Sequence, residues 1–400
     1  IIKHKFKFSI LFIGIVFYAF CLPSQLFNDP TSTVITSKED KLLGAMIAKD
    51  GQWRFPENKE ISEKFTTCLL QFEDEHFYNH PGFNPVSIVK AIRANIKAGS
   101  VKRGGSTITQ QVIRLSRKNP NRTYFEKVKE IILATRLELR ESKKNIISLW
   151  ANNAPYGGNV VGLEAASWRY FNRSPENLSW SESATLAILP NAPALIYPGK
   201  NQQRLLKKRN RLLAKLYRKS IIDSITYSLS IQEEIPKKAY RIPQITPHLL
   251  QKVAQTNQGK LVKTSVDYYL QKQVNEIAKR HYQKLSQNEI YNSAILVLDV
   301  KTRKVIAYVG NSPTTKEHQK DVDIINKPRS TGSILKPFLY GAMLDNGDIL
   351  PETLIPDIPT QIGTYQPENF NQEYAGAVPA KKALSRSLNI PAVKMLQQFG

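Results

Sequence analysis

One stretch of this chain joins a helical repeat of apolar residues to a run of acids. The apolar positions follow the i, i+4, i+7, i+8, i+11 spacing of a single helix face, and they are Ile61, Phe65, Cys68, Leu69 and Phe72. That spacing predicts a helix that packs one face into a core. Glu73, Asp74 and Glu75 come next, so Glu73 is expected where the core meets a cleft. An acidic triplet at a helix end is usually solvated, and its role therefore depends on what accompanies it.

Two further motifs accompany the acidic run. Residues 73 to 82 match the complete pattern E-D-x-x-F-x-x-H-x-G, and residues 104 to 111 read G-G-S-T-I-T-Q-Q. The second motif is expected to form a glycine-started loop, because glycine permits close backbone approach. The hydroxyl and amide side chains of this loop can bond sugar or phosphate oxygens. Together the motifs favour chemistry on a charged glycan over a solvated helix end.

A helix is predicted from residue 127 to about residue 140. Lys127 and Glu130 stand three residues apart and share one face of that helix. The apolar positions expected to point inward are Phe125, Val128, Ile132 and Leu139. Taken alone, this segment would be a surface helix with an ion pair.

In this order and at these spacings, the motifs resemble glycosyltransferase family 51, the lipid II polymerising domain of class A penicillin-binding proteins. The resemblance covers about residues 45 to 225 and continues through residues 152–158, 162–166, 170–171 and 182–193. The motif from Ala154 to Gly158 is most similar to the 1C type. The resemblance implies a mainly α, lysozyme-like domain with a cleft along the membrane surface. Its reaction joins lipid-linked disaccharide-peptide units, inverts the donor sugar and releases undecaprenyl pyrophosphate.

The resemblance also implies roles for individual residues. Glu73 matches the family's general base, which deprotonates the acceptor hydroxyl, and Glu130 matches the family's second important glutamate. The cations expected to bind pyrophosphate are Arg114, Arg122, Lys127 and Lys129. Further substrate-binding positions are Asp74, His80, Ser106, Thr107, Gln110, Gln111 and Asn152. Glu126 departs from the family, in which an arginine is usual at this position. The one cofactor considered is a divalent cation such as Mg²⁺, assisting pyrophosphate departure, and no metal ligands are assigned.

A second domain is predicted over residues 291–400. It begins with a strand pair at residues 294–300 and 304–310. The run Ser330 to Phe338 contains S-x-x-K, and Ser387-Leu388-Asn389 follows. These motifs resemble the transpeptidase of penicillin-binding proteins, an α/β, β-lactamase-like fold.

The resemblance makes Ser333 the acylated nucleophile and Lys336 its base, one helical turn away. Ser387 and Asn389 are then expected to bind substrate. The family's third motif, K-[ST]-G, does not follow before Gly400. Residues 1–400 are therefore expected to hold only the N-terminal part of this domain and not to be acylated by penicillin. The full-length parent is expected to be a D-Ala-D-Ala transpeptidase that binds β-lactams.

The charge of the chain points to anionic partners. Lys and Arg total 57 against 33 acids, a net charge of +24. No zinc finger and no basic run interleaved with aromatic residues is present, which argues against nucleic acid. The expected partners are lipid II, nascent glycan strands, membrane lipid and other cell-wall synthesis proteins. A basic helix between Lys200 and Lys219 would either dock by its leucines with a solvated face or contact anionic headgroups.

The N-terminus predicts the compartment. An uncharged stretch from Phe8 to Leu22 follows Lys3, Lys5 and Lys7. We interpret residues 6–22 as a single transmembrane anchor, with a signal peptide as the alternative. The basic flank assigns residues 1–5 to the cytoplasm and the rest to the periplasmic side of a bacterial inner membrane. Residues 23–45 are expected to be a stalk, 46–225 the glycosyltransferase domain and 226–290 a linker region.

Two other function classes remain open from the sequence. A peptidoglycan hydrolase or lytic transglycosylase would share the helical fold and one glutamate, but it would not need the cations between Arg114 and Lys129. A noncatalytic β-lactam sensor could keep the fold while Glu73 and Glu130 varied.

Overall fold

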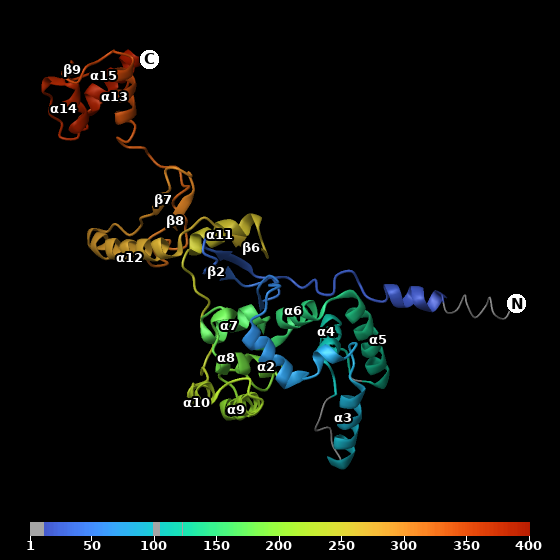
Figure 1. Cartoon of the computed structure of the whole chain (residues 1–400). Coiled ribbons are helices and arrows are strands. Elements are labelled where there is room, and N and C mark those ends of the chain that lie inside the picture. The colour runs from blue at the N-terminus through green and yellow to red at the C-terminus, as the bar shows by residue number, and fades with distance from the viewer. Residues whose placement is uncertain (1–11, 99–104, 122) are drawn as a thin grey trace. The chain divides into compact units, whose positions relative to one another are not determined.

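The computed structural model describes residues 12–98, 105–121 and 123–400, which divide into two compact units (Figure 1). The first unit extends to Ile325 and the second runs from Asn326 to Gly400. The division lies later than the expected domain start at residue 291. The reason is that the strand pair after that residue packs against a helix of the first unit.

Helices build the first unit between residues 63 and 232, as the sequence predicts. Their bounds are α2 Glu63–Glu73, α3 Pro85–Ala98, α4 Ile108–Ser116, α5 Tyr124–Arg140, α6 Lys143–Asn153, α7 Leu163–Phe171, α8 Trp180–Ile188, α9 Gln202–Arg218 and α10 Ser224–Gln232. Several helices begin where the sequence offers a cap. Thr107 and Gln110 form a capping box at α4, and Ser179 and Glu182 form another at α8. The second half of the expected glycine-started loop, residues 108–111, therefore belongs to α4.

The predicted stripe of α2 is buried. Phe65, Cys68 and Leu69 are fully inaccessible and belong to one large core. In that core α2 packs on α8, while α4 packs on both α5 and α6. A small sheet lies beside these helices, with strand order β3-β5-β4 over Trp53–Arg54, Val160–Val161 and Pro155–Gly157. This packing brings the C-terminal end of α2 beside α4.

The expected stalk and linker fold together, so these two predictions were wrong. Strand β1 (Thr33–Thr36) pairs antiparallel with β2 (Leu42–Met46) and parallel with β6 (Leu261–Lys263). Ile35 and Leu43 are buried against α11 (Pro247–Thr256). Threonine-rich polar segments suit half-buried strands as well as stalks. The partner strand lies more than two hundred residues away in the sequence, so a local pattern could not reveal the pairing.

The predicted strand pair near residue 300 is confirmed. β7 (Ile295–Leu298) pairs antiparallel with β8 (Val305–Val309), and both pack against α12 (Tyr268–Leu285). The second unit contains α13 Lys336–Asp345, β9 Leu354–Asp357, β10 Gly376–Pro379, α14 Ala380–Ser385 and α15 Asn389–Phe399. Met343, Ile355 and Met395 share its core.

The predicted anchor lies partly outside the described residues, which begin at residue 12. Residues 12–20 are helical, and their apolar side chains are mostly exposed. Among the described residues no helix has the length and apolarity needed to cross a membrane. The end of this segment is tied to α5, because Tyr18 donates to Thr135 and Arg136 donates to the carbonyl of Ala19.

Candidate active site

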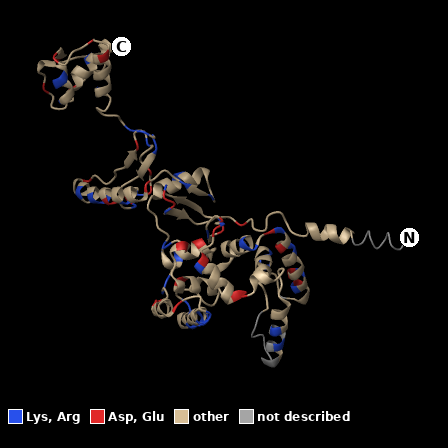
Figure 2. Cartoon of the chain, viewed as in Figure 1, with Lys and Arg blue, Asp and Glu red and all other residues tan. Residues whose placement is uncertain are grey.

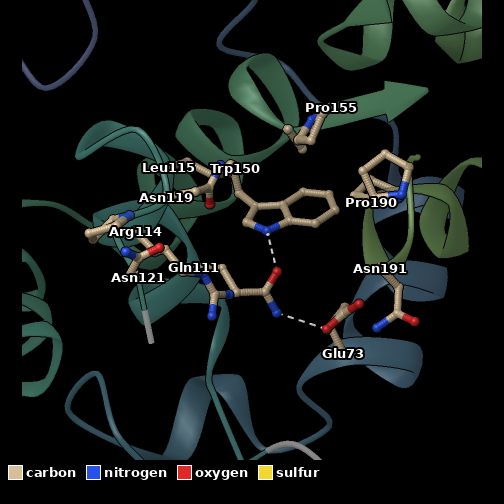
Figure 3. Close-up of a pocket in the computed structure, with 13 residues that line it drawn as sticks. Glu73, Gln111, Arg114, Leu115, Asn119, Asn121, Trp150, Pro155, Pro190 and Asn191 are labelled. Atoms are coloured by element: carbon tan, nitrogen blue, oxygen red, sulfur yellow. Dashed lines mark hydrogen bonds between the residues drawn. The ribbon is translucent and has the colours of Figure 1, made fainter. Parts of the chain in front are cut away.

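Glu73 is held by a chain of side-chain hydrogen bonds at the end of α2 (Figure 3). Gln111 Nε2 of α4 donates to Glu73 Oε2 at 2.7 Å, and Trp150 Nε1 of α6 donates to Gln111 Oε1 at 3.0 Å. An indole can only donate, so it directs the amide oxygen of Gln111 toward itself and the amide NH₂ toward Glu73. Three helices thus fix the orientation of one carboxylate.

A cavity of ≈ 470 Å³ opens beside this carboxylate. Its walls combine polar and apolar groups, and they are Glu73, Gln111, Arg114, Leu115, Asn119, Pro120, Asn121, Trp150, Ala154, Pro155, Pro190, Asn191 and Pro193. Amide and guanidinium donors beside leucine and proline side chains suit a sugar, which presents hydroxyl groups and an apolar face.

The surroundings of Glu73 balance two opposing effects on its ionisation. Burial raises the pKa of Glu73 above its ordinary value, and the neighbouring Asp74 adds to the rise. The hydrogen bond from Gln111 and the charges of Arg114 and Lys208 lower the pKa again. A carboxylate that is more basic than usual is better suited to accept a proton from a hydroxyl.

Asp74 and His80 were expected to bind substrate, but the structure pairs them with each other. Both are buried, with His80 Nε2 3.0 Å from Asp74 Oδ2, and the same oxygen accepts the backbone N–H of Ile108 at 3.1 Å. These bonds join the turn after α2 to the N-terminus of α4. The two residues position the site rather than line the cavity.

The motif glycine, Gly82, is explained by close backbone packing. Its φ is +93°, and a Cβ built there would meet the carbonyl oxygen of Ala134 at 2.7 Å. Its own carbonyl accepts the Thr107 hydroxyl at 2.7 Å. Thr107 is therefore engaged in this bond and in capping α4, where a substrate-binding role was expected.

Lys127 and Glu130 come together on α5, as the three-residue spacing predicts. Lys127 Nζ donates to Glu130 Oε2 at 2.8 Å, to Ser106 Oγ at 2.8 Å and to Gln110 Oε1 at 2.7 Å. Arg114 Nη1 lies 3.9 Å from Glu130 Oε1. The buried Glu130 thus holds two cations near the cavity, and Ser106 and Gln110 contact one of them.

The remaining predicted positions lie elsewhere. Lys129 is exposed, and Arg122 lies outside the described residues. Asn152 is buried and donates to the carbonyl of Asn58 at 2.8 Å, away from the cavity lining. Glu126 forms an ion pair with Arg117 at 2.6 Å. Glu126, which stands where an arginine is usual in the family, therefore neutralises Arg117 instead of adding a positive charge.

The prediction of which α5 residues point toward the core was wrong. Phe125, Val128, Ile132 and Leu139 are exposed, whereas Leu133, Ala134 and Leu137 are buried beside Glu130. The apolar residues of α5 occupy more than one face, and periodicity could not tell which face meets the core. Only the packing of α5 on α4 decides it.

Sequence reasoning did not single out Trp150 and Lys208. Trp150 is fully buried and orients Gln111, but nothing local distinguishes it from a core aromatic residue. Lys208 lies in the basic helix α9, among eight other Lys and Arg residues between Lys200 and Lys219. A tertiary contact alone marks it, because its Nζ donates to Asn191 Oδ1 at 2.9 Å.

The second unit gathers three of its four predicted residues. Lys336 Nζ donates to the carbonyl of Ser387 at 2.7 Å, to Ser387 Oγ at 3.3 Å and to Asn389 Oδ1 at 2.7 Å. Burial lowers the pKa of Lys336. Ser333 is exposed in a turn before α13, and the bonds of the Lys336 amine go to the other two residues. The expected pairing of Ser333 with Lys336 on one helical turn is therefore absent from this part of the structure.

Metal ligands do not cluster in the part of the chain that the structure describes, where no three His, Cys, Asp or Glu side chains gather suitably. Glu130 is already engaged by Lys127 and Arg114.

Comparison with known proteins covers both parts of the chain. Residues 39–217 match the family model Transglycosylase, and residues 293–400 match the model of the penicillin binding protein transpeptidase domain. Penicillin-binding protein 1C of Escherichia coli strain K12 is 34% identical over 380 residues, which cover 94% of this chain and 49% of that protein. The chain belongs to the class A penicillin-binding proteins.

Other members are similar over comparable lengths. Penicillin-binding protein 1F of Bacillus subtilis strain 168 is 29% identical over 359 residues, covering 85% of this chain and 50% of that protein. A crystal structure of penicillin-binding protein 1A from Haemophilus influenzae is 16% identical with a TM-score of 0.39, covering 94% of this chain and 62% of that chain. This penicillin-binding protein spans about half the length of the curated relatives it matches. Its Glu73 cavity lies wholly within the transglycosylase match.

Proposed function

We propose that this penicillin-binding protein polymerises lipid II and that Glu73 is the general base. The observation that carries the proposal is the carboxylate fixed by Gln111 and Trp150 at the wall of a cavity that also presents Arg114. Glu73 takes the proton of the acceptor's 4-hydroxyl as its oxygen attacks the anomeric carbon of the donor sugar. The bond from that carbon to the pyrophosphate oxygen breaks, and undecaprenyl pyrophosphate leaves with inversion.

The cations of α4 and α5 stabilise the departing charge. Arg114 lines the cavity, and Lys127 is held beside it through Glu130. Oriented cations in a partly dry site stabilise a developing anion better than solvent does, because they need no rearrangement during the reaction. A glycan hydrolase releases no pyrophosphate and gains nothing from this arrangement.

Incubation of the protein with lipid II tests the proposal. Glu73→Gln is expected to lower the polymerisation rate by about a hundredfold to ten-thousandfold, the usual range for a general base. The matched control is Glu63→Gln, at the exposed start of the same helix. Release of muropeptides from finished wall, or equal polymerisation by both variants, would contradict the assignment and favour a hydrolase or a noncatalytic role.

We also infer that the protein lies at the outer face of a bacterial inner membrane. Large apolar side chains are exposed on neighbouring parts of the first unit, namely Val86, Val89 and Ile96 of α3 and Tyr124, Phe125, Val128, Ile132 and Leu139 of α5. The apolar residues 12–20 end beside α5 through the Tyr18 and Arg136 bonds. Such a surface supports contact with a bilayer. Phe125→Ser should lower cosedimentation with anionic vesicles, and unchanged sedimentation would contradict this localisation.

Acyl transfer by Ser333 is a second candidate activity. The bonds of Lys336 to Ser387 and Asn389 favour it, since the three residues match the order of the transpeptidase motifs. We expect no stable labelling of residues 1–400 by a fluorescent penicillin, because the Ser333 hydroxyl is exposed and Lys336 bonds elsewhere. Labelling that is lost in Ser333→Ala would show that this part of the chain already acylates.

A further inference from the structure

The basic helix α9 turns three lysines toward the helix that carries Glu73. Lys208, Lys215 and Lys219 are separated by seven and four residues, so they share one helix face. Lys215 Nζ donates to the carbonyl of Gln71 at 2.6 Å and to Glu75 Oε2 at 2.7 Å, and Lys219 also bonds Glu75. We call Lys208, Lys215 and Lys219 the α9 lysine row. Figure 2 colours the Lys and Arg positions of α9 blue.

Lys208 is the member of the row nearest to the chemistry. It is partly buried, and its ammonium donates to Asn191 Oδ1 at 2.9 Å. Asn191 lines the same cavity as Glu73 and stands beside it in Figure 3. The bond to Asn191 therefore anchors a positive charge at the α9 side of the cavity, whereas Arg114 supplies one from α4.

We propose that Lys208 is a further positioning residue of the glycosyltransferase site, whose fixed charge keeps the Glu73 carboxylate ionised between substrate encounters. This inference rests on the proposed function of Glu73 as a base. A general base must be ionised before it can accept a proton, and partial burial opposes its ionisation. An anchored ammonium group offsets that cost without touching the substrate.

The electrostatics around both groups agree with this role. Charges facing Glu73 come from its own helix, from α4 and from α9: Asp74 raises the pKa of Glu73, whereas Arg114 and Lys208 lower it. Burial is the main cause that lowers the pKa of Lys208, and Arg204 and Arg211 lower it further, while Glu73 raises it. Lys208 thus lies among like charges, and Glu73 is the opposite charge that favours its charged form.

The effect on activity has a defined sign. Removal of the Lys208 charge should raise the pKa of Glu73 further. As the pH falls, Glu73 then becomes protonated, and inactive as a base, at a higher pH than in the wild type. The loss of rate is therefore largest on the acid side and disappears once Glu73 is ionised in both proteins. A residue that only supported the fold, or that only contacted substrate, would lower the rate by the same factor at every pH.

The test is the pH profile of kcat/KM for lipid II polymerisation by the whole chain. Lys208→Gln keeps a polar partner for Asn191 and is expected to lose about tenfold on the acid limb and less than about twofold on the alkaline plateau. Lys208→Arg should restore the wild-type profile. Lys207→Gln, which removes the same charge from an exposed neighbour, should match the wild type throughout.

An equal loss at every pH, or no loss on the acid limb, would overturn the inference while leaving the proposed function intact. An inactive wild type would instead sink the proposed function. In that event the carboxyl titration of Glu73, followed by NMR with ¹³C-labelled glutamate and identified by Glu73→Gln, still tests Lys208. A titration midpoint that moves to higher pH in Lys208→Gln but not in Lys207→Gln supports the pairing, and an unmoved midpoint refutes it.

Discussion

Helices α5 and α9 have the same length of 17 residues, and both combine Lys and Arg with apolar residues, yet the fold uses them in opposite ways. On α5 a carboxylate, Glu130, is buried, and large apolar residues are exposed. On α9 four leucines are buried, and a lysine row faces the end of α2. The comparison teaches that helical periodicity predicts which residues share a face, but not which partner that face meets.

The two helices also differ in how they treat buried charge. Glu130 of α5 pairs with Lys127 and faces Arg114, so its charge stays close to the cavity. Arg209 of α9 is fully buried away from the cavity, where it donates to Ser181 Oγ at 3.0 Å and to the carbonyl of Ile231 at 3.0 Å. Glu130 thus binds Lys127 and Arg114, whereas Arg209 links α9 to α8 and α10.

The largest expected effect concerns the buried carboxylate of α5. Glu130→Gln removes the charge that holds Lys127 and Arg114 near the cavity, and polymerisation is expected to fall by about a hundredfold or more. Glu126→Gln is the matched control on the same helix, because its ion pair with Arg117 is outside the cavity lining. Lipid II turnover measures both variants, and a comparable loss for the two would remove the distinction between the faces of α5.

The next prediction separates the buried from the exposed leucines of α5. Leu137 is 0% exposed, whereas Leu139 is 73% exposed. Leu137→Ala is therefore expected to cost about 2–5 kcal/mol of unfolding free energy, and Leu139→Ala less than about 0.5 kcal/mol. Urea unfolding followed by circular dichroism measures both values. A larger cost for Leu139→Ala than for Leu137→Ala would mean that α5 packs by the face that periodicity suggested.

The smallest expected effect concerns the α9 lysine row. Hydrogen bonds from Lys215 and Lys219 hold the pKa of Glu75 at about 2, below its ordinary value of 4.5. A depressed pKa means that Glu75 contributes stability above pH 4.5 and loses it as the pH falls toward 2. The contribution should stay below about 1 kcal/mol, because the carboxylate is partly solvated.

The melting temperatures of the wild type and Glu75→Gln should therefore differ at neutral pH and converge in acid. Lys215→Met should remove part of that difference, because Lys219 still bonds Glu75. The double variant should lose less than the sum of the two single variants, since Lys215 and Glu75 share one interaction. Additive effects of the two substitutions would show that Lys215 and Glu75 do not interact in solution.

Much of the Glu73 site was predictable from local sequence. The apolar spacing placed Glu73 at the end of a buried stripe, where Gln111 of the second motif bonds it, and the three-residue spacing on α5 paired Lys127 with Glu130. Asp74, His80 and Thr107 were assigned to substrate, because a motif does not reveal whether a polar side chain bonds a ligand or another part of the fold. Their hydrogen bonds join segments up to 34 residues apart.

The sequence by itself determined the family and the helical character of the glycosyltransferase domain, and it singled out Glu73 as the proposed base, because these depend on short-range spacing and on motif order. Tertiary structure alone decided that residues 33–46 form a sheet with residues 261–263, which apolar residues of α5 are exposed, and that Lys208 bonds Asn191 in the wall of the Glu73 cavity. Each of these depends on a contact between segments distant in the chain. Such contacts are set by how whole faces pack, and no local pattern encodes them.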